Sequence, residues 1–266
     1  MRIALTIAGS DSGGGAGIQA DLKTFQQFGV FGTSVIVALN AQNTRGVRAV
    51  EAVPEAMVSA QLTALAEDLP PAALKTGMLA EASLVRLVAK AIRENGWGPL
   101  VLDPVMVSTS GHRLLSTEAE WVVRELLMPL AALVTPNLDE ASLLTDRAVD
   151  DVPTMERAGR ALLDAGAAAA LVKGGHLDGD EVTDILVTPE GMIHFRRPRI
   201  ETTSTHGTGC TLSAAITAGL ALGRDLEIAV ADGLDYVHRA IRAAPGLGSG
   251  HGPLDHRVTA PPPPPL

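Results

Sequence analysis

The chain has 266 residues, of which 46% are hydrophobic and 3% aromatic, and its formal net charge is −9. This composition suits one large α/β domain or two small ones and argues against a nucleic-acid surface, which needs a basic face and stacking rings. The single cysteine excludes an internal disulfide framework, and no apolar run approaches membrane-spanning length, so we expect a cytoplasmic protein with no membrane partner.

In chain order, short β-branched apolar runs alternate with helical patterns, which predicts an α/β fold with a mostly parallel sheet covered by helices on both faces. The predicted strands are residues 3–8, 34–39, 73–77, 100–103, 132–135, 169–173 and 185–188. The predicted helices are residues 16–28, 54–66, 81–95, 116–127, 138–144, 154–165, 208–222 and 225–243.

Two further features complete the expected organisation. Residues 182–187 and 192–195, joined by a turn, predict an antiparallel hairpin at one sheet edge. No composition break marks an interior linker, so we expect a single domain over residues 1–258. The proline run at 261–265 predicts a disordered tail over residues 259–266.

A glycine-rich stretch at residues 9–17 follows the first predicted strand and opens a helix. Glycines there permit close approach of the backbone to a ligand, although a flexible connector would have the same composition. The spacing does not match G-x-G-x-x-G, and no G-x-x-x-x-G-K-[ST] motif occurs anywhere, so both common nucleotide-binding signatures are missing.

Two carboxylates follow neighbouring predicted strands, at the sheet edge where open α/β folds bind ligands. Asp103 ends one strand, and Glu140 follows the next after Asn137. Together they could hold Mg²⁺ through its waters while substrate phosphates bind the metal. Alternatively, Glu140 is an ordinary acidic residue in the first turn of a helix.

Cys210 lies where a loop containing Gly207 and Gly209 runs into a helix. The free amides and dipole of such a helix start attract anions and should lower the pKa of a thiol placed there. Lys173 ends another predicted strand and could add a cation. A buried structural Cys210 is the simpler alternative, and a hydrolase pairing of Cys210 with His206 is another, which we rank low.

The order and joint presence of seven short blocks closely resemble the hydroxymethylpyrimidine/phosphomethylpyrimidine kinases of thiamine biosynthesis. The blocks are residues 9–23, 41–44, 75–78, 103–106, 135–137 with Glu140, 173–176 and 206–210. The resemblance covers nearly the whole chain. It implies a ribokinase-like fold with a small β element near the site, and a homodimer.

The resemblance also implies a reaction and a set of roles. ATP would phosphorylate 4-amino-5-hydroxymethyl-2-methylpyrimidine and then its monophosphate, giving the diphosphate. The implied substrate-binding residues are Gly9, Asp21, Gln42 and Met78. The implied metal ligands are Asp103 and Glu140, and Lys173, Thr208 and Asn137 would contact ATP. The implied catalytic residues are Lys173, Gly207, Thr208, Gly209 and Cys210, with Cys210 standing where related sugar kinases carry an aspartate base.

Three positions depart from the family pattern: Ser204 replaces a common asparagine, while Thr109 and His112 stand where lysine and aspartate are common. These departures bear on rate and nucleotide preference more than on reaction class. The alternative functions are a pyridoxal/pyridoxine kinase and a non-catalytic nucleotide or vitamin-precursor sensor. Gln42 favours the pyrimidine, because a carboxamide can accept from an exocyclic amine and donate to a ring nitrogen.

Overall fold

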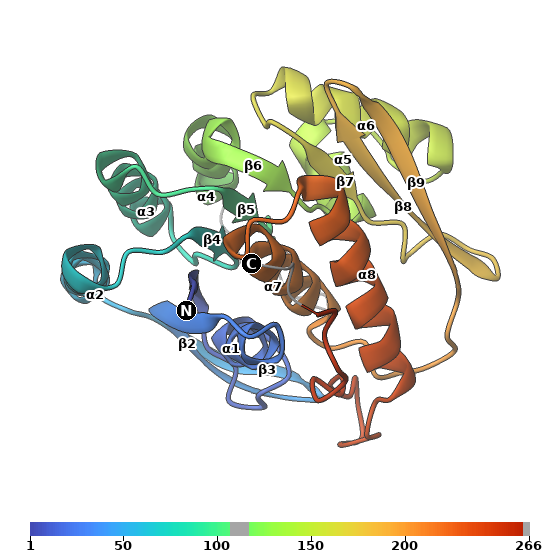
Figure 1. Cartoon of the computed structure of the whole chain (residues 1–266), viewed down its shortest axis with the longest axis horizontal. Helices are drawn as coiled ribbons and strands as arrows, with labels where there is room; N and C mark the ends of the chain where they lie inside the picture. The colour runs from blue at the N-terminus through green and yellow to red at the C-terminus, as the bar shows by residue number, and fades with distance from the viewer. Residues whose placement is uncertain (107–116, 263–266) are drawn as a thin grey trace.

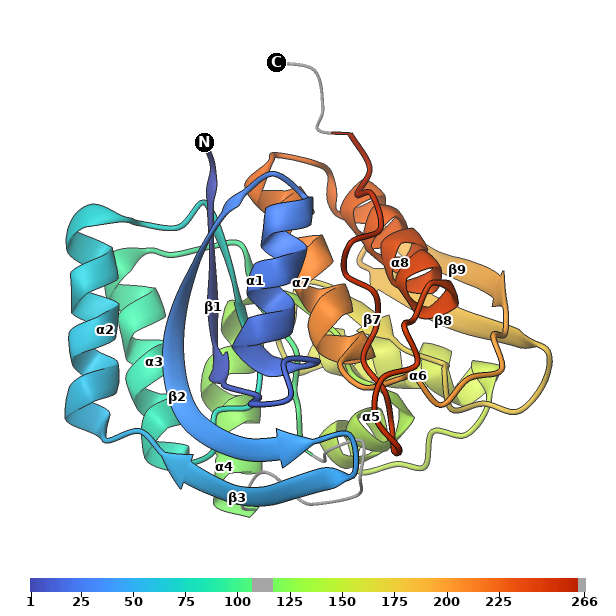
Figure 2. The same cartoon turned by 90° about the horizontal axis from the view of Figure 1, so that it is seen from below.

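The computed structural model describes residues 1–106 and 117–262 (Figures 1 and 2). Within these residues, nine strands form one sheet in the order β3-β2-β1-β4-β5-β6-β7-β8-β9. Their bounds are β1 Ile3–Gly9, β2 Phe31–Asn43, β3 Gly46–Ala52, β4 Ala73–Thr76, β5 Leu100–Leu102, β6 Ala131–Val134, β7 Ala170–Val172, β8 Glu181–Thr188 and β9 Gly191–Pro198. Pairing is parallel from β2 through β7 and antiparallel for β3, β8 and β9, which confirms the predicted sheet and its edge hairpin.

Helices cover both faces of the sheet (Figure 1). One layer contains α1 (Gly17–Gln27), α7 (Thr208–Ala221) and α8 (Leu226–Arg242). The other contains α2 (Glu55–Asp68), α3 (Ala82–Asn95), α4 (Thr117–Val122), α5 (Leu138–Thr145) and α6 (Val152–Asp164). The helix expected to run to residue 127 changes into a π-helical turn at Val123–Leu127 and a 3₁₀ turn at Met128–Leu130. None of the helices in the described ranges is both long and apolar enough to cross a membrane.

The core consists of two apolar clusters, one on each face of the sheet. Leu5 and Ile7 of β1 pack into the cluster beneath α2 to α6, whereas Ala4 packs into the cluster beneath α1, α7 and α8. This alternation follows from the two-residue period of a strand. Since both faces are buried, the central strands read as continuous apolar runs, which is why the sequence pattern located them.

The β2–β3 hairpin is the part of the sheet that the sequence analysis missed. β2 extends beyond the predicted residues 34–39 on both sides, and β3 was not predicted at all. Residues of β3 are exposed or half-buried, so they carry little of the apolar pattern that marks a core strand. The hairpin places Asn40 and Gln42 beside the loop that follows β1.

The segment after α8 packs back onto the domain. Val258 and Ala260 pack against the cluster beneath α7 and α8. The Arg239 guanidinium donates to the Thr259 carbonyl oxygen at 2.6 Å, and the Arg224 guanidinium donates to the Pro262 carbonyl oxygen at 2.6 Å. Ordered packing therefore continues past residue 258 to residue 262, into the segment expected to be a disordered tail.

Candidate active site

A cavity of about 770 Å³ lies at the carboxyl ends of the parallel strands. Residues that end five of these strands or follow them within three positions line it: Gly9, Gly77, Asp103, Asn137 and Lys173. The start of α7 lines it as well, through residues 207–210. The parallel topology thus brings to one edge of the sheet side chains that are far apart in the sequence.

The start of α7 has the geometry of an anion cradle. Gly207 precedes the helix with φ = 84°, and no side chain caps the helix start. Within the described ranges, the amides of Gly209 and Cys210 donate to no acceptor. A Cβ on Gly207 would collide with the Gly15 carbonyl oxygen, and a Cβ on Gly209 would lie 3.3 Å from Lys173 Nζ. Free amides, the helix dipole and an ammonium group therefore converge on one point of the cavity.

Asp103 is buried beside this cradle and accepts three hydrogen bonds. It accepts from Lys173 Nζ at 3.3 Å, Thr135 Oγ1 at 3.3 Å and Ser213 Oγ at 3.2 Å. Burial alone would raise the pKa of Asp103, but the cations Lys173 and Lys75 outweigh it and hold the pKa below its usual value. Asp103 therefore presents a carboxylate at neutral pH.

Glu140 has both of the roles that the sequence left open. It is the third residue of α5, where it accepts from the Asn137 amide at 2.8 Å and completes a capping box. It also lines the cavity, with Oε2 4.0 Å from Lys173 Nζ. Burial is the main cause of a raised pKa of Glu140, which is about 7. The charge of Lys173 opposes this rise, and the charge of Asp103 adds to it.

The carboxylates fit a hydrated magnesium ion better than a metal held by protein alone. Over residues 1–106 and 117–262, no three His, Cys, Asp or Glu side chains are grouped to hold a metal. Two oxygen-donor groups facing a cavity with an anion cradle match Mg²⁺, which keeps several waters and binds phosphate oxygens. Asp103 and Glu140 would hold such an ion, and Lys173 lies between them.

Cys210 faces the cavity, but its thiol is not acidified. Burial raises its pKa to about 12, because the opposing charge of Lys75 is weaker than burial and the carboxylates of Asp21 and Asp103 add to the rise. The expected lowering of the pKa of Cys210 is therefore wrong. We expected the helix start to have the largest effect on this pKa, whereas burial and the nearby carboxylates have a larger one. His206 bonds to Asp11, so Cys210 has no histidine partner within residues 1–106 and 117–262.

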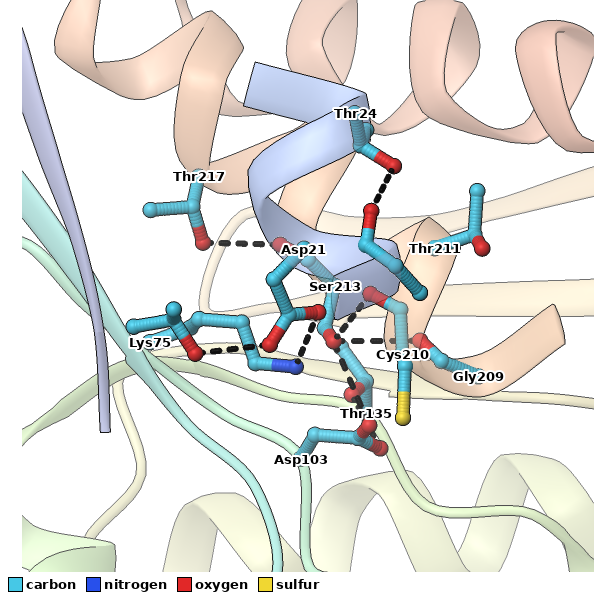
Figure 3. A network of polar contacts seen from close by, with 12 residues as sticks. Asp21, Thr24, Lys75, Asp103, Thr135, Gly209, Cys210, Thr211, Ser213 and Thr217 are labelled. Atoms are coloured by element: carbon cyan, nitrogen blue, oxygen red, sulfur yellow. Dashed lines mark hydrogen bonds and ion pairs between the residues drawn. The ribbon is translucent and has the colours of Figure 1, made fainter. Parts of the chain in front are cut away.

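Asp21 lies beneath the cavity and is completely buried (Figure 3). Its carboxylate accepts from Lys75 Nζ at 3.0 Å and Thr6 Oγ1 at 2.6 Å, and it is not among the lining residues. Lys75 is also completely buried, and the carboxylates around it, with Cys210, keep its pKa above the usual value although burial opposes this. Sequence reasoning missed this ion pair. The only signal was a lysine inside an apolar four-residue strand.

The other predicted substrate-binding residues line one end of the cavity. They are Gly9, Gln42 and Met78. A Cβ on Gly9 would lie 2.8 Å from Met78 Cε, so any larger residue at this position would displace the end of the methionine side chain. Asp11, which the sequence analysis did not select, organises the neighbouring loop by accepting from the amides of Gly13, Gly15 and Ala16.

The opposite end of the cavity lies between the β8–β9 hairpin and α8. Its apolar lining includes Val182, Ile200, Leu234, Val237 and Ile241. The expected nucleotide contacts Thr208 and Asn137 line the middle of the cavity near Lys173. Ser204 is buried away from the lining, and Thr109 and His112 lie outside the described residues.

The three-layer fold, with an anion cradle facing two carboxylates and a lysine, defines a ribokinase-like phosphotransferase. The sequence profile of the phosphomethylpyrimidine kinase family matches residues 11–255, so the chain belongs to that family.

Individual relatives agree with this assignment. The chain is 52% identical to the hydroxymethylpyrimidine/phosphomethylpyrimidine kinase of Rhizobium meliloti over 257 residues, which cover 96% of each chain. The crystal structure of phosphomethylpyrimidine kinase from Clostridium difficile is 43% identical, with a TM-score of 0.82, and the match covers 91% of this chain and 100% of that one. A pyridoxal kinase from Bacillus subtilis, solved as an ADP complex, is 36% identical with a TM-score of 0.89, covering 96% and 97%.

Proposed function

We propose that this chain transfers the γ-phosphoryl group of ATP to the hydroxymethyl group of 4-amino-5-hydroxymethyl-2-methylpyrimidine and then phosphorylates the monophosphate. The observation that carries the proposal is the position of the anion cradle. Residues 207–210 and Lys173 lie between the end lined by Gln42 and Met78 and the apolar slot beside α8. A phosphoryl group held at the cradle would face an acceptor on one side and its nucleotide on the other.

The residues of the chain supply positioning and charge neutralisation, which dominate phosphoryl transfer. Mg²⁺ held by Asp103 and Glu140 would neutralise charge on the nucleotide phosphates. The amides of Gly209 and Cys210 and the Lys173 ammonium would receive the equatorial oxygens of the transferring group. Thr208 and Asn137 would contact ATP, and Gly9, Gln42 and Met78 would surround the ring of the acceptor.

Asp21 does not fit the role of a direct substrate contact as well as these residues do. Its complete burial and its bonds to Lys75 and Thr6 support a structural role beneath the site. Cys210 lines the cavity at the cradle and would act as the base for the hydroxymethyl proton, and its high pKa would make that role depend on pH.

The test is product mass after incubation of the purified protein with Mg-ATP and the hydroxymethylpyrimidine, with pyridoxal in a parallel reaction. We expect the pyrimidine to gain one phosphate and then a second. Phosphate on pyridoxal alone would favour the second candidate, a pyridoxal kinase, which the similarity to the Bacillus subtilis enzyme supports. Binding of both ligands without any product would indicate a sensor.

We also propose that the protein is a homodimer. The family resemblance implies this state, and the exposed side chains of Leu39 on β2 and Val50 on β3 would be available to a second copy at the edge hairpin. Light scattering at working concentrations tests this, and a monomeric mass would contradict it.

A further inference from the structure

Asn40 is a cavity-lining residue to which the family resemblance gives no role. It lies on β2 two residues before Gln42, and both side chains line the end of the cavity that contains Gly9 and Met78. Its backbone is held from both sides by the loop after β1. The Asn40 amide donates to Ser10 Oγ at 3.3 Å, and its carbonyl oxygen accepts from the Ser12 amide at 3.4 Å. The position of this side chain is therefore fixed by the same loop that forms the site.

The carboxamide of Asn40 has no partner within the described residues. Its Oδ1 atom is buried and accepts no hydrogen bond, and its Nδ2 atom lies 3.3 Å from where a Gly9 Cβ would be. A buried carbonyl oxygen without a donor is unfavourable, so such a group in a cavity indicates a ligand that supplies the donor. Rotation about the terminal side-chain bond exchanges oxygen and nitrogen without changing the shape of the group.

The carboxamide of Gln42 lies beside a pair formed by His206 and Asp11. Asp11 holds its carboxylate 2.8 Å from His206 Nε2, so this ring nitrogen carries the proton and donates. Burial opposes ionisation of Asp11, but His206 and the surrounding backbone amides hold its pKa below the usual value. Gln42 Nε2 lies 3.4 Å from the same His206 nitrogen. Because the one proton on that nitrogen is donated to Asp11, His206 accepts no hydrogen bond from Gln42, and the Gln42 NH₂ group stays available to donate to a ligand in the cavity.

We propose that Asn40 is a specificity-determining residue whose Oδ1 accepts a hydrogen bond from the exocyclic amine of the substrate, while Gln42 donates to the adjacent ring nitrogen. This inference rests on the proposed function and deepens it. An aminopyrimidine edge presents a donor next to an acceptor, and the two carboxamides present the complementary order. Pyridoxal offers an aldehyde and a phenolic oxygen in place of an amine, so it does not present this order of donor and acceptor.

The experiment compares kcat/KM for the aminopyrimidine and for its analogue without the 4-amino group, in the wild type and in Asn40→Leu, which keeps the side-chain shape. In the wild type we expect the analogue to be about 10-fold to 100-fold poorer, because a polar group built to bind the amine loses its partner. In Asn40→Leu we expect that ratio to fall to within about threefold of unity, while the KM for ATP stays unchanged.

Asn43→Leu is the matched control, since Asn43 is an exposed asparagine of the same strand that lies outside the cavity lining, and it should keep the wild-type ratio. Asn40→Ala repeats the test without added apolar bulk if Asn40→Leu does not fold. An unchanged ratio in the Asn40 variants, or an equal loss with both compounds, overturns the inference and leaves the proposed function standing. A wild type that phosphorylates neither pyrimidine overturns both.

Discussion

The chemistry of Cys210 depends on the charges buried around it. Lys75 alone would favour a thiolate, but Asp21 and Asp103 oppose it and the thiol is largely desolvated. These groups form one connected region beneath the start of α7, as Figure 3 shows. With a pKa of about 12 the thiol is protonated at neutral pH, so its catalytic use requires conditions or ligands that favour the thiolate.

Replacing Cys210 by Ala is expected to lower kcat by about 10²-fold to 10⁴-fold with a smaller effect on KM, because a positioned base is lost. In the wild type, kcat should rise with pH from neutrality, since the thiolate fraction increases up to a pKa of about 12. Steady-state rates between pH 6.5 and about 9.5 check both points. Cys210→Ala turnover equal to that of the wild type at every pH would remove the base role.

Loss of Lys75 should destabilise the fold more than loss of an exposed ion-pair partner. Lys75→Met leaves the Asp21 carboxylate buried without its cation, which costs about 3–5 kcal/mol in the free energy of unfolding. Adding Asp21→Asn to Lys75→Met should recover part of this loss, because the unpaired charge is removed. Urea denaturation measures both effects. Arg86→Ala is the control, since its exposed pair with Glu118 is worth less than about 1 kcal/mol.

Among the elements, α7 has the most direct role in the site. Its start provides the free amides, and Ser213, one turn into the helix, holds Asp103. Ten of the 14 residues of α7 are buried, all of them after Cys210, so the body of the helix is fixed between the sheet and its neighbours α1 and α8. The cradle therefore belongs to a rigid element and does not depend on loop ordering.

Gly209→Ala tests the cradle without disturbing the fold. The new Cβ would lie 3.3 Å from Lys173 Nζ, the flexible end of a side chain, so the ammonium group would shift away from the phosphate position. We expect a higher KM for ATP and a kcat lower by about tenfold or more, with an unfolding free energy close to that of the wild type. Gly207→Ala should differ by destabilising the protein, because Gly207 has a positive φ and lies against the Gly15 backbone. Equal KM values for ATP in Gly209→Ala and the wild type would contradict the cradle.

The sequence predicted elements well wherever burial imposed a strong pattern. The parallel core strands, the edge hairpin and most helix ends were found because their apolar periods and glycine stops are local signals. β3 could not be found, since it is held by pairing with β2 and by few buried side chains. The same limit applies to the site. The sequence analysis selected Asp103, Glu140 and Lys173 as site residues because they follow predicted strands. The ion pairs Asp21–Lys75 and Asp11–His206 join residues far apart in the sequence, so no local pattern indicates them.

The segment after α8 connects several distant elements. His256 Nε2 lies 3.0 Å from Thr211 Oγ1 on α7. The backbone carbonyl oxygen of His256 accepts a hydrogen bond from the Tyr236 hydroxyl on α8 at 2.8 Å. Burial, with a further contribution from the charge of Lys23, lowers the pKa of His256 to about 4, while Asp255 opposes the shift. The folded protein therefore keeps this imidazole neutral.

Acidification should weaken the fold through His256. Between pH 6.5 and 4 the unfolded chain takes up a proton that the folded chain does not, which lowers the free energy of unfolding by about 3 kcal/mol. Glu140 acts in the opposite sense, because its raised pKa favours the folded state as the pH falls from about 7. The difference between wild type and His256→Gln isolates the histidine. Denaturation curves that give the same difference at pH 7 and pH 4.5 would contradict the prediction.

The pair of Asp11 and His206 joins positions 195 residues apart, and His206 is itself bridged to Pro253. During synthesis, the loop after β1 leaves the ribosome long before its partners exist. Neither Gln42 nor the α7 cradle can reach its final arrangement until nearly the whole domain has been made, so a partly synthesised chain should have no working site. Ligands that bind the finished site would then stabilise completed molecules alone, and their concentration would affect how much active protein accumulates.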